Sequence, residues 1–262
     1  MKIQYASDLH LEFSDNARYL RDNPLIPVGD ILVLAGDIGY LNDDNYSKHP
    51  FWDYVSDNFN QVIVMVGNHE LYKYYDLAKM PQGLVCTIRS NVKCYYNEII
   101  QIDDIDLIIS TLWAKIPLEE AFITERGVSD FRRILYNEEL LTFDNFNREH
   151  ERCFQFIQDA VTKSLAKHII VATHHVPSFQ LSSPDFSGSN INGAFTVELG
   201  EYIASSPIEY WIYGHSHRNI EKVIGRTKCV SNQLGYVFHN EHHSFDFGKI
   251  IETGGRIANP PL

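Results

Sequence analysis

The chain carries little positive charge for its size. Its 262 residues include 22 lysines and arginines against 34 aspartates and glutamates, so the formal net charge is −12. Nucleic acids and anionic membranes bind broad basic surfaces, and this acidic balance therefore argues against both as partners. No apolar run in the sequence is long enough to span a bilayer, which also argues against a membrane-embedded protein.

Cysteine is scarce and shows neither a metal-binding nor a disulfide-framework pattern. The four cysteines are Cys86, Cys94, Cys153 and Cys229, and no two of them form a CxxC pair. Because free cysteine is among the most buried residue types, we expect buried thiols rather than a disulfide between Cys86 and Cys94. No signal-peptide pattern precedes the first strand-like segment. Together these features predict a reduced, cytoplasmic protein.

Apolar residues make up 44% of the chain, which is enough for a large core. Along the chain, strand-like apolar runs alternate with helix-like patterns. Residues 30–35 and 61–66 read as strands buried on both faces, and residues 51–59 between them have the spacing of an amphipathic helix. This β-α-β order favours parallel strands. Further strand patterns lie at residues 2–6, 99–102, 106–111, 168–173, 209–213, 226–231 and 248–252, with an antiparallel hairpin expected for 99–102 and 106–111.

Residues 112–166 interrupt this alternation. Thr142 can cap a helix that runs to about Ala166, with Phe146 and Ile157 on its apolar side. The stretch before it has weak periodicity and predicts an insertion over the sheet edge. The insertion would act either as a lid over a site or as an exposed connector; we favour the lid because long irregular loops in compact domains are often functional.

Five motifs that carry metal-ligand side chains stand along the chain. Most of them directly follow a strand-like run, and α/β proteins place their chemistry at such strand ends. D-x-H and G-D are weak signals alone, since ordinary turns contain the same residues. The G-N-H-E and G-H-x-H motifs are stronger, because few apolar strands end in so many polar ligands. The motifs are Asp8-Leu9-His10, Gly36-Asp37, Gly67-Asn68-His69-Glu70, Thr173-His174-His175 and Gly214-His215-Ser216-His217.

The ordered set of motifs resembles the signature of the calcineurin-like metallophosphoesterase superfamily. All five elements stand in the family's order between residues 7 and 217. The resemblance implies one domain over residues 1–262, of the α/β class. Its architecture would be a four-layer α/β/β/α sandwich of two mixed sheets, with a helical insertion at about 112–166. The motif loops would then meet at one edge of the molecule.

The resemblance also implies two divalent metal ions bridged by Asp37. His174 is preferred to His175 as a ligand because it comes first after its strand. Nitrogen and oxygen ligands without cysteine favour Mn, Fe or Zn over Ca. The implied ligands are Asp8, His10, Asp37 and His217 for the first ion and Asp37, Asn68, His174 and His215 for the second.

The implied activity is hydrolysis of a small phosphomonoester or phosphodiester by hydroxide that the two metals activate. His69, outside the ligand set, would give a proton to the leaving oxygen or bind the phosphoryl group, with Glu70 or another carboxylate orienting its ring. Asn68 and His69 would also contact the substrate. The adjacent Arg132 and Arg133 could grip phosphate oxygens, with a surface salt bridge as the equal alternative.

Other substrate contacts and functions stay open at this point. Ser178, Asn190 and Asn192 follow the His174 motif and could line a pocket. Trp113, Phe131 and Tyr136 could stack on a base or aryl group, although core packing is the preferred interpretation. A nuclease is one alternative function, disfavoured by the acidic balance. A non-catalytic binding scaffold is another, disfavoured by the complete ligand set.

Overall fold

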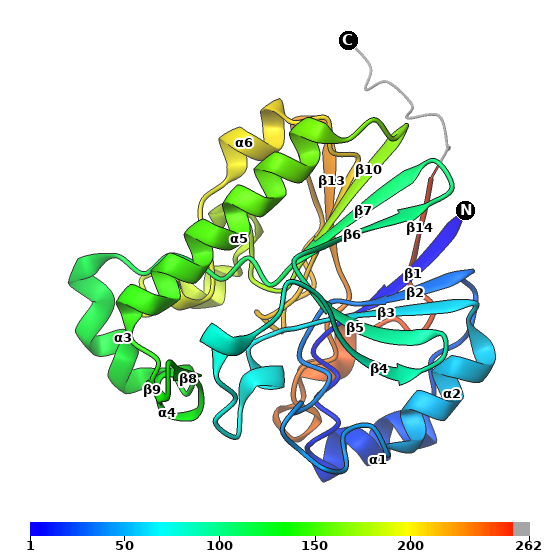
Figure 1. The fold of residues 1–262 in the computed structure, drawn as a ribbon, viewed down its shortest axis with the longest axis horizontal. Helices are drawn as coiled ribbons and strands as arrows, with labels where there is room; N and C mark the ends of the chain where they lie inside the picture. The colour runs from blue at the N-terminus through cyan, green and yellow to red at the C-terminus, as the bar shows by residue number, and fades with distance from the viewer. Residues whose placement is uncertain (254–262) are drawn as a thin grey trace.

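The computed structural model describes residues 1–253 and contains two six-stranded mixed sheets (Figure 1). The first sheet consists of β1 (Lys2–Ala6), β2 (Ile31–Leu34), β3 (Gln61–Met65), β4 (Gly83–Arg89), β5 (Val92–Tyr96) and β14 (Ile250–Glu252). Its strand order is β14-β1-β2-β3-β5-β4. The four central strands pair in parallel, and the two edge strands pair antiparallel to their neighbours.

The second sheet has the same plan. It consists of β6 (Glu98–Ile102), β7 (Ile105–Ser110), β10 (His168–Thr173), β11 (Tyr210–Tyr213), β12 (Lys222–Ile224) and β13 (Thr227–Ser231). Its order is β12-β13-β11-β10-β7-β6, again with parallel central strands and antiparallel edges. The antiparallel hairpin predicted from the sequence is β6–β7, which turns at Asp103 and Asp104.

The two sheets pack face to face through alternate residues of their strands. In β2, Ile31 and Val33 join an inner cluster that also contains Leu107 of the second sheet. Leu32 and Leu34 of the same strand belong to the outer cluster beneath the helices. Successive side chains of a strand point to opposite faces, so both faces of β2 are buried and its sequence is continuously apolar.

Helices cover the outer face of each sheet (Figure 1). The first sheet is covered by α1 (Ser14–Asp22) and α2 (Pro50–Asn58), and the second by α5 (Phe143–Lys163) and α6 (Gly200–Ser205). In α2 the buried residues are Phe51, Trp52 and Val55, which share one face at helical spacing. The predicted four-layer α/β/β/α sandwich is therefore confirmed.

Some elements have no clear signal in the sequence. The short helix α1 is mostly polar and buries only Asn16 and Leu20. Strand β4 lies at the edge of its sheet and is largely half-exposed, so its apolar alternation is weak. Short 3-10 helices occupy His69–Leu71, Leu77–Lys79, Leu118–Glu120, Phe179–Leu181, Pro184–Phe186, Asn192–Ala194, Val237–His239 and Glu241–Ser244.

The segment 112–166 divides into two parts. Its second part is α5, which packs against β7 as a layer of the sandwich and ends at Lys163 rather than near Ala166. Its first part holds α3 (Ala121–Gly127), α4 (Asp130–Arg133) and a small hairpin of β8 (Leu135–Tyr136) and β9 (Glu139–Leu140). These pieces gather beside one end of α5 (Figure 1), and their action as a lid stays a prediction.

All four cysteines have free thiols, as the sequence predicted. Cys94, Cys153 and Cys229 are buried, whereas Cys86 is half-buried on β4. Cys86 and Cys94 lie opposite each other across the β4–β5 pair. Among residues 1–253, no helix combines the length and the apolar character that crossing a membrane requires.

The N-terminus of α5 gives a direct test of the fold. The Thr142 side chain accepts a hydrogen bond from the backbone N–H of Asn145 at 3.3 Å. We expect Thr142→Ala to lower the free energy of unfolding by about 1 kcal/mol, because it leaves that N–H without its cap. The measurement is urea unfolding followed by circular dichroism. The matched control is Thr162→Ala in the exposed last turn of α5, where the same change should stabilise slightly or do nothing. Equal destabilisation by both changes would contradict the capping role.

Candidate metal centre

The five motif loops meet at one edge of the sandwich. Asp8 and His10 follow β1, Asp37 follows β2 and Asn68 follows β3, all in the first sheet. The histidine motifs of the second sheet follow β10 and β11 at the corresponding strand ends. Because these strands are parallel within each sheet, their carboxyl ends lie on the same side and their loops converge.

Asp8, His10 and His217 form a first group of candidate ligands. One ligand atom from each lies within 4.8 Å of the others. The Nε2 atoms of His10 and His217 are 3.0 Å apart, and Oδ1 of Asp8 is 3.4 Å from Nε2 of His217. Asp8 and His10 are fully buried.

Asp37, His174 and His215 form a second such group. Nε2 of His174 lies 3.2 Å from Oδ1 of Asp37, 3.0 Å from Oδ1 of Asn68 and 3.2 Å from Nδ1 of His215. Oδ2 of Asp37 lies 4.0 Å from Nε2 of His10, which belongs to the first group. The carboxylate of Asp37 therefore lies between the two groups and is within reach of both.

The far ring nitrogens of three of these histidines are held by oxygen atoms. Nδ1 of His10 is 3.1 Å from Glu12, Nδ1 of His217 is 2.6 Å from Glu241, and Nδ1 of His174 is 2.9 Å from the carbonyl of Ala35. Partners of this kind fix the ring and direct its other nitrogen in metal sites. Two imidazole nitrogens that face each other can share only one proton, whereas a cation between them satisfies both. The donor set fits divalent cations.

The backbone of the motif loops is in an unusual conformation. Asp8, His10, Asp37, His215 and His217 have φ angles of 55°, 49°, 57°, 73° and 50°. Such left-handed conformations are uncommon for residues other than glycine and concentrate at functional sites. Here each one turns a candidate ligand toward the common centre.

Buried carboxylates set the electrostatics of the cluster. Burial lowers the pKa of His174, but the carboxylates of Asp37 and Asp8 outweigh it and raise that pKa to about 10. Likewise burial lowers the pKa of His217, and its bonds to Asp8 and Glu241 outweigh burial and raise it to about 9. The pKa of His215, which is buried beside two other histidines, is held well below its usual value. The negative charge of the carboxylates thus draws positive charge into the cluster.

Glycines and Glu70 shape the loops around Asp37. A Cβ at Gly67 would collide with the Asp37 carboxylate, and one at Gly36, where φ is 87°, would collide with His174. The buried Glu70 carboxylate accepts hydrogen bonds from the backbone N–H groups of Gly67 and Asp37 at 2.7 and 2.8 Å, and from Ile38 at 2.7 Å. Glu70 therefore holds two motif loops together.

The carboxylate that orients His69 is Glu12, not Glu70. Oε1 of Glu12 lies 2.7 Å from Nδ1 of His69, and the same oxygen contacts Nδ1 of His10. Nε2 of His69 lies 3.9 Å from Oδ2 of Asp37 and 3.4 Å from the hydroxyl of Tyr236. One carboxylate thus positions both a candidate ligand and the candidate proton donor. Nothing in the sequence points to Glu12 beyond its place two residues after His10.

Asp130 fixes the orientation of Asn68. The side-chain amide of Asn68 donates to Oδ1 of Asp130 at 2.9 Å, and the Tyr72 hydroxyl donates to the same oxygen at 2.7 Å. This arrangement turns Oδ1 of Asn68 toward His174. Asp130 lies in the segment before α5, far from any motif, and sequence reasoning missed it.

Of the two histidines after β10, the structure brings His174 to the cluster. His175 is fully buried and packs with its ring against Trp113 and Phe146. Its Nδ1 lies 3.3 Å from the carbonyl of Thr111, and its ring centre lies 4.1 Å from that of His215.

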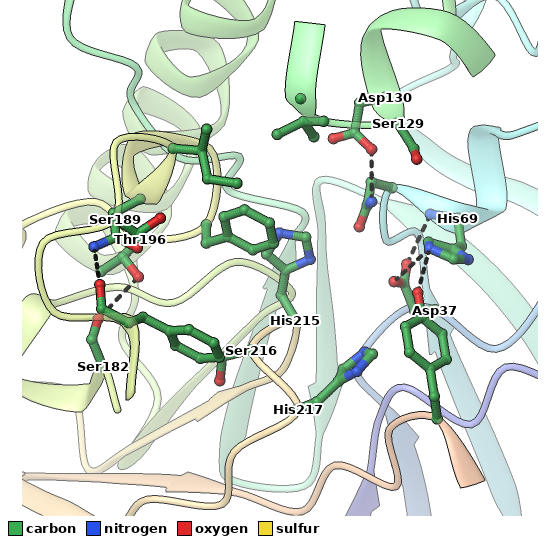
Figure 2. A pocket seen from close by; sticks show the side chains of 18 of the residues that line it. Asp37, His69, Ser129, Asp130, Ser182, Ser189, Thr196, His215, Ser216 and His217 are labelled. Carbon is green, nitrogen blue, oxygen red and sulfur yellow. Dashed lines mark hydrogen bonds and ion pairs between the residues drawn. The ribbon is translucent and has the colours of Figure 1, made fainter. Parts of the chain in front are cut away.

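A cavity of about 370 Å³ opens on the cluster. Figure 2 shows Asp37, His69 and His217 at one end and the segment with Ser182 and Ser189 across the space from them. Residues 127–130 contribute another part of the wall, and Tyr236 and Glu241 close it near His217. Of the three polar residues expected after His174, only Asn192 lines this cavity among the described residues.

The predicted arginine contacts are not brought into the cavity wall. Nη1 of the exposed Arg132 donates to the carbonyl of Arg126 at 2.6 Å. The guanidinium of Arg133 lies 5.1 Å from the ring centre of Tyr72, which lines the cavity, and Arg133 itself is not part of the lining among the described residues. Trp113 and Phe131 pack in the core against Phe146, as expected.

Comparisons with known proteins agree with this architecture. A model of the calcineurin-like phosphoesterase family matches residues 1–219. Protein L509 of Acanthamoeba polyphaga mimivirus, which is uncharacterized, is 30% identical over 272 residues that cover 93% of this chain and 94% of L509. Phosphopantetheinyl hydrolase from Mycobacterium tuberculosis shares the fold with a TM-score of 0.67 at 15% identity, over 99% of this chain and 98% of that one. TT1561 of Thermus thermophilus shares it with a TM-score of 0.51 at 11% identity, over 88% of each chain. The chain belongs to the calcineurin-like phosphoesterase family.

Proposed function

We propose that the protein is a metal-dependent phosphoesterase that hydrolyses a phosphomonoester or phosphodiester at a pair of divalent cations. The observation that carries the proposal is the buried cluster in which Asp37 lies between two groups of imidazole and carboxylate ligand atoms. Membership of the calcineurin-like phosphoesterase family supports hydrolysis of a phosphate ester. A cytoplasmic location stays a prediction.

We assign the ligands as the family resemblance implies, with Asp37 shared between the two cations. Mn, Fe and Zn all suit this mixture of imidazole, carboxylate and amide ligands. Two divalent cations, when bound, would lower the pKa of water and neutralise charge on the phosphoryl oxygens. Within the proposed ligand set only Asp8 and Asp37 carry negative charge, so the ligands alone would not neutralise two divalent cations. The first cation would be held by Asp8, His10, Asp37 and His217, and the second by Asp37, Asn68, His174 and His215.

His69 would handle the proton of the leaving oxygen. Its Nδ1 is engaged by Glu12, so its Nε2 is the nitrogen that faces the cavity. Nε2 of His69 lies 3.9 Å from Oδ2 of Asp37, which places the ring next to the proposed position of the phosphoryl group. Asn68 and His69 are thus the proposed contacts to the phosphoryl group, whereas no contact in the structure supports Arg132 or Arg133 in that role.

An assay with two p-nitrophenyl esters tests the function. We expect the metal-free protein to be inactive on both p-nitrophenyl phosphate and bis(p-nitrophenyl) phosphate. Added Mn²⁺ should start release of nitrophenol from at least one of them, and a chelator should stop it. The Asp37→Asn variant controls for contaminating phosphatases, because it replaces the shared carboxylate with a neutral amide that cannot bridge through two oxygens, and it should lack the activity. Protein with a full complement of metal that hydrolyses neither ester would contradict the proposal.

The role of His69 is tested by changing the leaving group. We expect His69→Ala to lower kcat on an alkyl phosphate ester by roughly 10²–10⁴-fold, the usual scale for an acid–base group. The loss on a p-nitrophenyl ester should be much smaller, since nitrophenolate leaves without a proton. Glu12→Gln should reproduce this pattern with a loss of roughly 10–100-fold.

Elemental analysis of the same variants provides the control. His69→Ala should keep its metal, and Glu119→Gln, the same change as Glu12→Gln at an exposed position, should behave as the unaltered protein. Equal losses on the alkyl and nitrophenyl esters would show that His69 does not protonate the leaving oxygen.

A further inference from the structure

The loop after β13 places Tyr236 beside the candidate metal centre. The backbone N–H of Gly235 donates to the carbonyl of Asp8 at 3.1 Å, which joins this loop to the loop after β1. The backbone N–H of Tyr236 donates to Oε2 of Glu241 at 2.7 Å, and the same oxygen lies 2.6 Å from Nδ1 of His217. The position of Tyr236 is therefore fixed relative to two candidate ligands.

The ring of Tyr236 lies between histidines of the cluster. Its centre is 4.6 Å from that of His10 and 4.5 Å from that of His217. It also packs edge-on against Phe13 at 5.5 Å and stacks on Phe238 at 5.2 Å. Close packing on several sides leaves a ring little room to move, so the hydroxyl group has a defined direction.

The hydroxyl group of Tyr236 is available at the edge of the cavity. Tyr236 lines the cavity, and it is half-buried rather than enclosed. Its hydroxyl lies 3.4 Å from Nε2 of His69, and that nitrogen lies 3.9 Å from Oδ2 of Asp37. The distance to His69 is longer than that of a strong hydrogen bond. An oxygen atom of a substrate can therefore replace His69 as the acceptor at little cost.

Three other hydroxyl groups of the cavity wall already have closer partners. The Tyr72 hydroxyl donates to Oδ1 of Asp130 at 2.7 Å. The hydroxyls of Ser182 and Thr196 are 3.1 Å apart and pair with each other. Compared with these three groups, the hydroxyl of Tyr236 is the one that is both near Asp37 and weakly engaged.

We propose that Tyr236 contacts the substrate and donates a hydrogen bond from its hydroxyl to a non-bridging oxygen of the phosphoryl group. The proposal rests on the proposed phosphoesterase function and adds a binding residue to that site. Tyr236 lies beyond residues 1–219, so the family match does not assign this role. Two donors 3.4 Å apart can meet two neighbouring oxygens of one phosphoryl group, which leaves His69 for the leaving oxygen. A donor in this position stabilises negative charge on the phosphoryl group.

Removal of the hydroxyl alone tests the contact. We expect Tyr236→Phe to lower kcat/KM of the Mn²⁺-loaded protein by roughly 10–100-fold, the usual scale for a hydrogen bond to a charged group. The loss should be equal on an alkyl phosphate ester and on a p-nitrophenyl ester, because the non-bridging oxygens are present whichever group leaves. A loss confined to the alkyl ester would overturn the contact, since Tyr236 would then act only through His69.

Two further outcomes separate this proposal from the proposed function. Full activity of Tyr236→Phe on both esters would overturn the contact and leave the phosphoesterase function intact. An unaltered protein that is loaded with metal and hydrolyses no ester would overturn both.

Binding of inorganic phosphate gives a readout that does not depend on turnover. In titration calorimetry of the Mn²⁺-loaded protein, we expect Tyr236→Phe to raise the Kd for inorganic phosphate at least roughly tenfold. Manganese content should be the same in both proteins, because the variant keeps the ring that packs on His10 and His217. Equal phosphate affinity in the two proteins would overturn the proposal.

Tyr40→Phe is the matched control. The ring of Tyr40 also lies beside His69, with the ring centres 6.1 Å apart, but Tyr40 is not among the described residues that line the cavity. This variant loses the same hydroxyl group and should keep the kcat/KM and the phosphate affinity of the unaltered protein. Equal losses in both variants would overturn a specific contact, since any change beside His69 would then disturb the site.

Discussion

Negative charge buried at the meeting edge of two sheets is the constraint on which the rest of the site depends. Asp8 and Asp37 are buried at the ends of β1 and β2. Charges in such a place need positive partners, and the surrounding imidazoles turn toward them. Proton or metal can supply that partner, and the mutual approach of His10 with His217 and of His174 with His215 leaves the ring nitrogens directed at common points. The proposed pair of cations would neutralise this buried negative charge, and the ligand atoms that would bind them are already close together.

Two glutamates hold this arrangement without belonging to the proposed ligand set. Glu70 ties the loop after β2 to the loop after β3 through backbone N–H groups. Glu12 joins His10 to His69 through a single oxygen, so the candidate ligand and the candidate acid keep a fixed relation. Left-handed backbone at Asp8, Asp37 and His215 is tolerated because packed strands precede each loop. The packed strands thereby hold the candidate ligands in fixed positions.

Much of the fold could be predicted from the sequence, because a strand buried on both faces appears as a continuous run of apolar residues. Runs such as Ile31–Leu34 have few alternative explanations, and polar motifs at their ends point to one edge. Helix α1 and strand β4 were not predictable in this way, since α1 is mostly polar and β4 is a half-exposed edge strand without a clear apolar alternation. The contact of Arg132 could not be predicted from the residue type. Its guanidinium donates to the carbonyl of Arg126, and this partner depends on the path of the chain around α4.

Site residues that belong to a recognisable motif were predictable from the sequence, and single residues that reach the site from other loops were not. His69 and Asn68 sit in one motif, whereas Asp130 and Tyr236 approach them from distant loops. The central claim is that two cations share Asp37. Anomalous diffraction from crystals of the Mn²⁺-loaded protein tests it most directly. The account predicts two peaks, roughly 3.5–4 Å apart, on either side of the Asp37 carboxylate. A single peak, or two peaks of which only one contacts Asp37, would contradict it.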